Sequence, residues 1–199
     1  LFREALYGDQ PAGRDNGGTE KSVLNIKRAD IKKHFDTYYR GENVCIVFAG
    51  DISYAQGHRL ADKFFKSVQT GEKLNKIGVT NPKSLALNRV VIKDKRNDQS
   101  HLVLGFKGLS GLDKGFYIFH VLTMILGGGM SSRLFSEVRD KRGLAYYVGA
   151  GGVSGSDYGH LTVQAGVSHN NLIKSLRVII KEINKIKKYA PAFAEMKKI

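Results

Sequence analysis

The stretch from residue 127 to residue 147 constrains the fold of this chain more than any other part of the sequence. It begins with the run Gly127 to Gly129, which allows the backbone to turn sharply and to approach other segments closely. A charged amphipathic segment follows and stops at Gly143, as expected for a helix that ends in a glycine. An apolar, aromatic segment typical of a β-strand comes next. Arg139 and Tyr146 therefore flank a helix-to-strand bend, an arrangement typical of a functional site.

The rest of the chain alternates between helical and strand patterns. Apolar residues at helical spacing predict helices at Lys27–Tyr39, Tyr54–Val68, Lys114–Leu126 and from Leu172 onward. Apolar or alternating runs predict strands at Asn43–Ala49, Asn88–Lys93, Ser100–Phe106, Tyr146–Gly151 and Gly159–Val167. Together these patterns predict an α+β fold, with an antiparallel or mixed sheet of about five strands and helices packed on one face.

We expect one main domain. Residues 1–18 resemble the tail of a preceding domain or a linker, because a short helical end is followed by a loop rich in glycine. Residues 19–199 form the domain itself, and the last helical pattern is cut off at Ile199. Since Leu1 is not a natural start, we expect the chain to be a fragment.

Composition favours a globular protein without a nucleic-acid partner or a membrane span. The chain has 42% hydrophobic residues and a net charge of +14. The charge is compatible with an acidic partner such as nucleic acid, but the basic residues are spread along the chain, which favours solvated lysines and no nucleic-acid partner. The apolar run Phe116–Leu126 is shorter than the roughly 20 residues that a membrane span needs. Cys45 has no partner cysteine and is expected to be buried in its strand.

Several kinds of chemistry lack a matching motif. The histidines are scattered and show no zinc-ligand spacing. The glycine run does not match a phosphate-binding loop, because Met130 and Ser131 stand where a lysine would be required. The spacing of a dinucleotide-binding loop is absent as well.

The block from Leu126 to Tyr147 closely resembles the second domain of the pitrilysin or insulinase family of zinc peptidases, in particular its bacterial members similar to the mitochondrial processing peptidase. The sequence of this block contains Leu-Gly-Gly-Gly-Met-Ser-Ser-Arg-Leu-Phe and then Glu-Val-Arg-Asp-Lys-Arg-Gly-Leu-Ala-Tyr. Lys27 to Tyr39, Asn43 to Ile52 and Asp98 to Phe106 agree with other segments of that family. The resemblance covers nearly the whole chain.

The resemblance implies a zinc-dependent endopeptidase built from two similar halves that enclose an extended peptide or unfolded polypeptide. Zinc would be held in the other half, upstream in the same chain or in a partner subunit of a homo- or heterodimer, so that this fragment binds none and is inactive alone. The implied catalytic and substrate-binding residues are Tyr146 and Arg139, and the glycines that would give the substrate clearance are Gly127, Gly128 and Gly129. A guanidinium suits peptide carbonyl groups, and a phenol can donate a hydrogen bond to an oxyanion.

Two alternatives remain from the sequence. A non-catalytic relative, such as a core subunit of the respiratory cytochrome bc1 complex, would keep the fold for assembly, but the intact pair Arg139 and Tyr146 argues against it. A basic nucleic-acid-binding module is supported by net charge alone. The compartment is left open, with the cytoplasm favoured over the periplasm.

Overall fold

The computed structural model describes residues 1–75, 77–80 and 90–197. The chain divides into two compact units. One contains residues 1–14 and 78–199, and the other contains residues 15–77. The domain boundary expected between residues 18 and 19 stays a prediction.

The unit formed by residues 15–77 is helical. It contains α2 (Glu20–Asn25), α3 (Arg28–Tyr38), the 3-10 turn Gly41–Asn43 and α4 (Tyr54–Phe65). Two of these helices begin with capping boxes. In each, the side chain of a serine or threonine accepts the backbone N–H of the third helical residue, and the side chain of that residue accepts the backbone N–H of the serine or threonine. Thr19 and Ser22 cap α2, and Ser53 and Gln56 cap α4. The predicted helices at residues 27–39 and 54–68 are confirmed with slightly shorter bounds.

The strand predicted at Asn43–Ala49 is wrong. Residues 44–49 carry no strand pairing in the described part of the chain, and the side chain of Cys45, expected to be buried, is exposed. Apolar residues of α4 are exposed too, including Phe64, which is 65% exposed. An apolar run favours burial, but it forms a strand only when a neighbouring strand supplies hydrogen-bond partners. Within this unit the described residues supply none.

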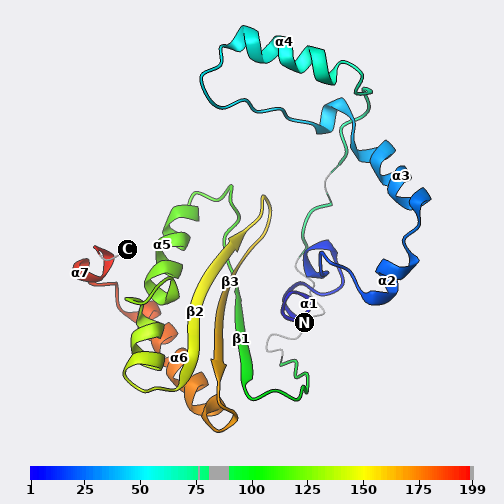
Figure 1. Cartoon of the computed structure of the whole chain (residues 1–199). Helices are drawn as coiled ribbons and strands as arrows, with labels where there is room; N and C mark the ends of the chain where they lie inside the picture. Colours follow the sequence, from blue (N-terminus) through cyan, green and yellow to red (C-terminus); the bar gives the residue numbers. More distant parts are fainter. Residues whose placement is uncertain (76, 81–89, 198–199) are drawn as a thin grey trace. The chain divides into compact units, whose positions relative to one another are not determined.

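The other unit is built on an antiparallel sheet of three strands in the order β1-β3-β2 (Figure 1). The strands are β1 (Ser100–Lys107), β2 (Ala145–Ser154) and β3 (Gly159–Val167). The α+β class is confirmed, but the described residues form a sheet of three strands where about five were predicted. Of the strand predicted at Asn88–Lys93, residues 88 and 89 lie outside the described residues, and residues 90–93 carry no strand.

Helices surround this sheet. They are α1 (Phe2–Tyr7), α5 (Phe116–Gly127), a π-helix called η3 (Phe135–Asp140), α6 (Leu172–Lys188) and α7 (Phe193–Met196). Two 3-10 turns, Pro11–Gly13 and His169–Asn171, complete the set. No helix among the described residues is long and apolar enough to cross a membrane.

One face of the sheet forms the core with α5 and α6. The inward-facing residues of β3 are at most 8% exposed, and they pack with Phe119 and Leu126 of α5 and with Ile179 of α6. The inward-facing residues of β3 are Leu161, Val163, Ala165 and Val167. Because both helices contribute to one cluster, the prediction that helices pack on one face of the sheet is confirmed for α5 and α6.

The opposite face is partly covered by the N-terminal segment. Phe2 lies over Gly105 of β1, where a Cβ would come within 1.8 Å of its ring. The hydroxyl of Tyr7 lies 2.9 Å from His160 Nδ1 and 3.1 Å from the carbonyl oxygen of Gly159, and both rings are buried. The first residues of the chain are thus an integral part of this unit.

Candidate functional site

The segment between α5 and β2 contains a π-helix, η3, where the sequence predicts an ordinary helix. Its widened turn is shown by the N–H of Lys141, which donates to the carbonyl oxygen of Ser136 at 2.9 Å. Gly143 ends the segment with a φ of +58°, a conformation that glycine adopts without strain. Its N–H donates to the backbone carbonyl oxygen of Arg139, and the N–H of Leu144 donates to the carbonyl oxygen of Val138, both at 2.9 Å. Short π-helices are rare and are frequent at functional sites.

Arg139 lies on the exposed side of this π-helix. Its guanidinium carbon is 4.9 Å from the centre of the Phe135 ring, one turn earlier. A guanidinium held over an aromatic face by a cation–π contact does not use its N–H donors in a conventional hydrogen bond. The stacking therefore restricts the direction of the Arg139 side chain without using its hydrogen-bonding groups.

The other basic side chains of residues 133–142 are paired with carboxylates. Arg133 forms a two-bond ion pair with Glu195 of α7, at 2.5 and 2.9 Å. Lys141 and Arg142 each donate to the carboxylate of Glu137 at 2.6 Å. Arg133 and Glu137 lie four residues apart, a spacing that favours an ion pair on a helix, but the carboxylate that pairs with Arg133 is that of Glu195.

Glu137 is correspondingly acidic. The hydrogen bonds from Lys141 and then Arg142 lower the pKa of its carboxyl group from 4.5 to about 2. A carboxylate held this firmly is not available to Arg139. Within residues 1–75, 77–80 and 90–197, Arg139 has no carboxylate partner, which leaves its charge open to a ligand.

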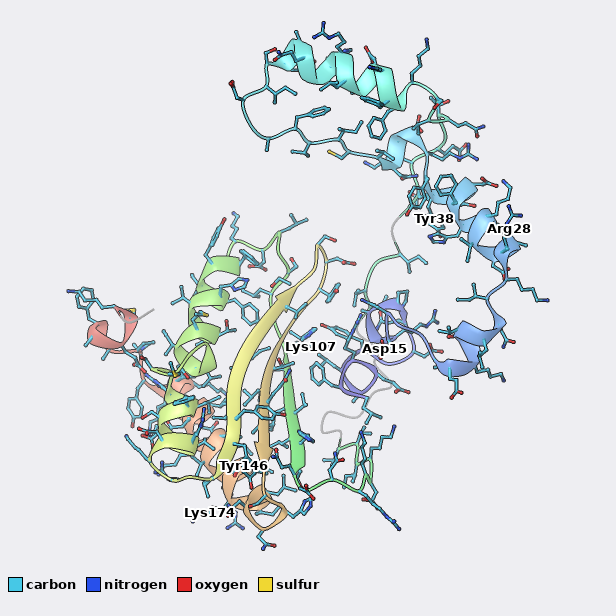
Figure 2. All side chains as sticks on the ribbon, in the orientation of Figure 1. Asp15, Arg28, Tyr38, Lys107, Tyr146 and Lys174 are labelled. Carbon is cyan, nitrogen blue, oxygen red and sulfur yellow. The ribbon has the colours of Figure 1, made fainter. Side chains whose placement is uncertain are left out.

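Tyr146 occupies an irregular position in β2. Ala145 pairs with Val167 and Tyr147 pairs with Gly166, so that Tyr146 is an extra residue in the ladder, a β-bulge. Bulges are common beside active sites because they change the direction of a side chain. Tyr146 is 59% exposed and lies at the beginning of β2 (Figure 2).

The three glycines differ in their surroundings. Gly127 is the buried last residue of α5, and a Cβ there would lie 2.2 Å from the backbone nitrogen of Ala150 in β2. At Gly128 a Cβ would meet Met124 of the preceding turn. Gly129 is exposed and a Cβ would have nothing within 4 Å. Close helix–strand packing explains the first glycine, and the substrate-binding role predicted for all three stays a prediction.

Comparison with known proteins shows the family of this chain. Residues 25–199 match the model of the peptidase M16 inactive domain. The chain belongs to this family. It is 32% identical over 186 residues to an uncharacterized zinc protease of Rickettsia felis, a match that covers 93% of this chain and 44% of the relative.

Solved structures share the fold of this M16 inactive domain. A peptidase M16 inactive domain from Pseudomonas fluorescens is 26% identical, with a TM-score of 0.86 over 98% of this chain and 47% of that chain. A chain of complex III2 from Candida albicans is 16% identical, with a TM-score of 0.78 over 98% of this chain and 48% of that one, and shares the fold. The chain spans less than half the length of these relatives.

Among the described residues of this M16 inactive domain, no set of side chains matches the ligands of a zinc site. In the described parts of the chain, no three His, Cys, Asp or Glu side chains gather closely enough to hold a metal ion. The two groups predicted for the site, Arg139 and Tyr146, are not zinc ligands of the usual kind.

Two features of the site were missed by sequence reasoning. Phe135 precedes Arg139 by four residues, a spacing that could have suggested the stacking. His101 of β1 lies 3.0 Å from the hydroxyl of Tyr147 and is separated from it by 46 residues, so no local pattern could have revealed the contact.

Proposed function

We propose that this domain binds an extended peptide and completes the stabilisation of the transition state in a zinc-dependent endopeptidase. The observation that carries the proposal is that only some of the basic side chains just before β2 pair with carboxylates. Those of residues 133, 141 and 142 are neutralised by carboxylates, whereas Arg139 has none in the described part of the chain. Along the chain Arg139 is followed by Gly143, whose backbone is in the left-handed conformation, and then by the exposed bulge residue Tyr146.

Arg139 is the substrate clamp in this proposal. Its guanidinium presents several N–H donors in a fixed plane, which match the carbonyl oxygens of an extended peptide. The Phe135 ring at 4.9 Å limits the rotation of the side chain, so less conformational entropy is lost when a peptide binds. The low pKa of Glu137 supports the same role, because its charge is committed to Lys141 and Arg142.

Tyr146 is the hydrogen-bond donor to the oxyanion. When a peptide carbonyl is attacked, negative charge develops on its oxygen, and a donor fixed in advance stabilises that charge more than it stabilises the substrate. The bulge supplies the fixed position, and the 59% exposure of the side chain leaves the phenol accessible.

The zinc-bearing half belongs to the part of the protein outside this chain, either upstream in the same polypeptide or in a partner subunit of a homo- or heterodimer. The chain covers 44% of a relative called a zinc protease, which leaves room for a second half. The described residues of this chain supply no ligand set for the metal. The substrate is an extended peptide or an unfolded polypeptide.

Substitution of Tyr146 by phenylalanine in the full-length protein tests the proposal. Loss of one oxyanion donor lowers kcat on the order of 10²- to 10³-fold. Zinc content and KM should change little, because the phenol acts in the transition state. Arg139→Lys retains the charge but loses the planar fork, so we expect it to raise KM.

Tyr117→Phe is the matched control, since Tyr117 lies on α5 and is 79% exposed. It should leave both constants unchanged. An unchanged kcat in Tyr146→Phe would refute the catalytic role. A full-length protein with no peptidase activity would instead favour the non-catalytic assembly subunit.

A further inference from the structure

The residue after the bulge, Tyr147, is held across the sheet. Its hydroxyl lies 3.0 Å from Nδ1 of His101, and the two rings lie 6.1 Å apart with an angle of 29° between their planes. His101 belongs to β1 and Tyr147 to β2, and these strands are separated by β3. The tyrosine ring therefore spans the central strand of the sheet.

Gly166 of β3 makes this arrangement possible. It pairs with His101 on one side and with Tyr147 on the other, so the three residues form one row across the sheet. A Cβ at Gly166 would lie 2.3 Å from Cε1 and 2.7 Å from Cδ1 of the Tyr147 ring. The ring rests directly on the glycine backbone, which leaves no space for a larger residue under it.

The row fixes one side of the bulge, and the core fixes the other. Ala145 pairs with Val167, and both side chains are buried, at 9% and 0% exposure. Tyr147 is tied to His101 over Gly166. Tyr146 lies between these two anchored residues and is the extra residue of the ladder. Its backbone direction is therefore determined by what holds its neighbours.

We propose that His101, Gly166 and Tyr147 form a clasp that positions Tyr146 for its role in the reaction. The inference rests on the function proposed for Tyr146. The clasp residues act through the backbone of the bulge and do not touch the substrate. A side chain that donates in the transition state must be held within a fraction of an ångström, and a displacement of about 1 Å can lower the rate on the order of 10²-fold.

The clasp predicts a specific pattern of kinetics in the full-length protein. Tyr147→Phe removes the bond to His101 but keeps the ring, and we expect kcat to fall roughly 10-fold while KM stays within about twofold. His101→Ala should have the same effect, and the double variant should be no worse than either single one, because a single hydrogen bond joins the two residues. His101→Gln retains a group that can bond the hydroxyl and should recover part of the rate.

The decisive measurement is the effect of Tyr147→Phe in a Tyr146→Phe background. A positioning residue has nothing left to position there, so kcat should not fall further. An equal fall of roughly 10-fold in both backgrounds would show that Tyr147 acts independently of Tyr146 and would overturn the inference. An unchanged kcat in Tyr147→Phe alone would overturn it as well.

A spectroscopic readout separates this inference from the proposed function. With 3-fluorotyrosine at position 146, the ¹⁹F resonance should shift or broaden in Tyr147→Phe and remain unchanged in Tyr117→Phe, whose substitution is on α5. A changed resonance together with an unchanged kcat in Tyr146→Phe would mean that the clasp holds Tyr146 but that Tyr146 is not catalytic, which defeats the proposed function and the catalytic purpose of the clasp. An unchanged resonance together with a large loss of kcat in Tyr146→Phe would defeat the clasp and keep the proposed function.

Discussion

Gly127→Ala tests whether the glycine run serves packing. The Cβ of an alanine would lie 2.2 Å from the backbone nitrogen of Ala150 and 2.8 Å from the carbonyl carbon of Gly149. These atoms belong to the backbone of β2, which is held in place by its hydrogen bonds to β3. They cannot move aside as the end of a flexible side chain could, so α5 must shift away from the sheet.

The expected magnitude follows from two opposing effects. Alanine favours a helix over glycine by up to about 1 kcal/mol, less at a helix end. Overpacking of a close contact costs about 1–3 kcal/mol, and here it also displaces Leu126, which is 1% exposed. The net loss of unfolding free energy is about 1–2 kcal/mol. For a chain of this size that lowers Tm by roughly 2–8 °C.

Thermal unfolding followed by circular dichroism measures the effect, with Gly129→Ala as the matched control. At Gly129 a Cβ has nothing within 4 Å and the backbone has no positive φ. Its stability should stay within about 0.5 kcal/mol of the parent. Equal losses in both variants, or no loss in Gly127→Ala, would refute the packing argument. A rise in KM in Gly129→Ala at unchanged stability would support the predicted clearance for substrate.

Three further predictions concern stability. Burial lowers the pKa of His160. The contribution of its neutral ring to the free energy of unfolding is therefore complete above about pH 6.5 and is lost as the pH falls below that value. Burial raises the pKa of Tyr7 from 10.0 to about 12, so its contribution is complete below pH 10 and is lost between pH 10 and about pH 12. Urea unfolding should show both declines, and a profile that rises in either range would contradict them. Arg133→Ala should speed hydrogen exchange in residues 193–196 and lower stability by roughly 1–3 kcal/mol, whereas Arg142→Ala should leave that exchange unchanged.

Local patterns predicted the part of the fold that surrounds the site. Gly159–Val167 could be predicted as a strand because apolar residues alternate with small or polar ones, and Ser100–Lys107 because it is a short run rich in apolar residues. Leu172–Lys188 could be predicted as a helix because its apolar residues repeat at helical spacing. The end of the helical segment at Gly143 was also predicted, and the φ of +58° observed there is one that glycine adopts without strain.

The remaining features depend on contacts that spacing cannot show. An apolar run such as Val44–Ala49 has the composition of a strand, but composition does not supply a neighbour with free backbone groups. The pair Arg133 and Glu195 joins residues that are 62 positions apart, and a one-residue widening of the helix at Phe135–Asp140 leaves no trace in the hydrophobic period. Arg139 and Tyr146 could be proposed from the sequence, whereas the groups that hold their neighbours could not.

The bulge at Tyr146 has an evolutionary consequence. If residue 146 were deleted, Ala145 would still oppose Val167 and Tyr147 would still oppose Gly166, and inward and outward side chains would alternate without interruption. The sheet does not need this residue for its own hydrogen bonding. A lineage could therefore lose the phenol of Tyr146 by deletion of a single codon and keep a well-formed domain.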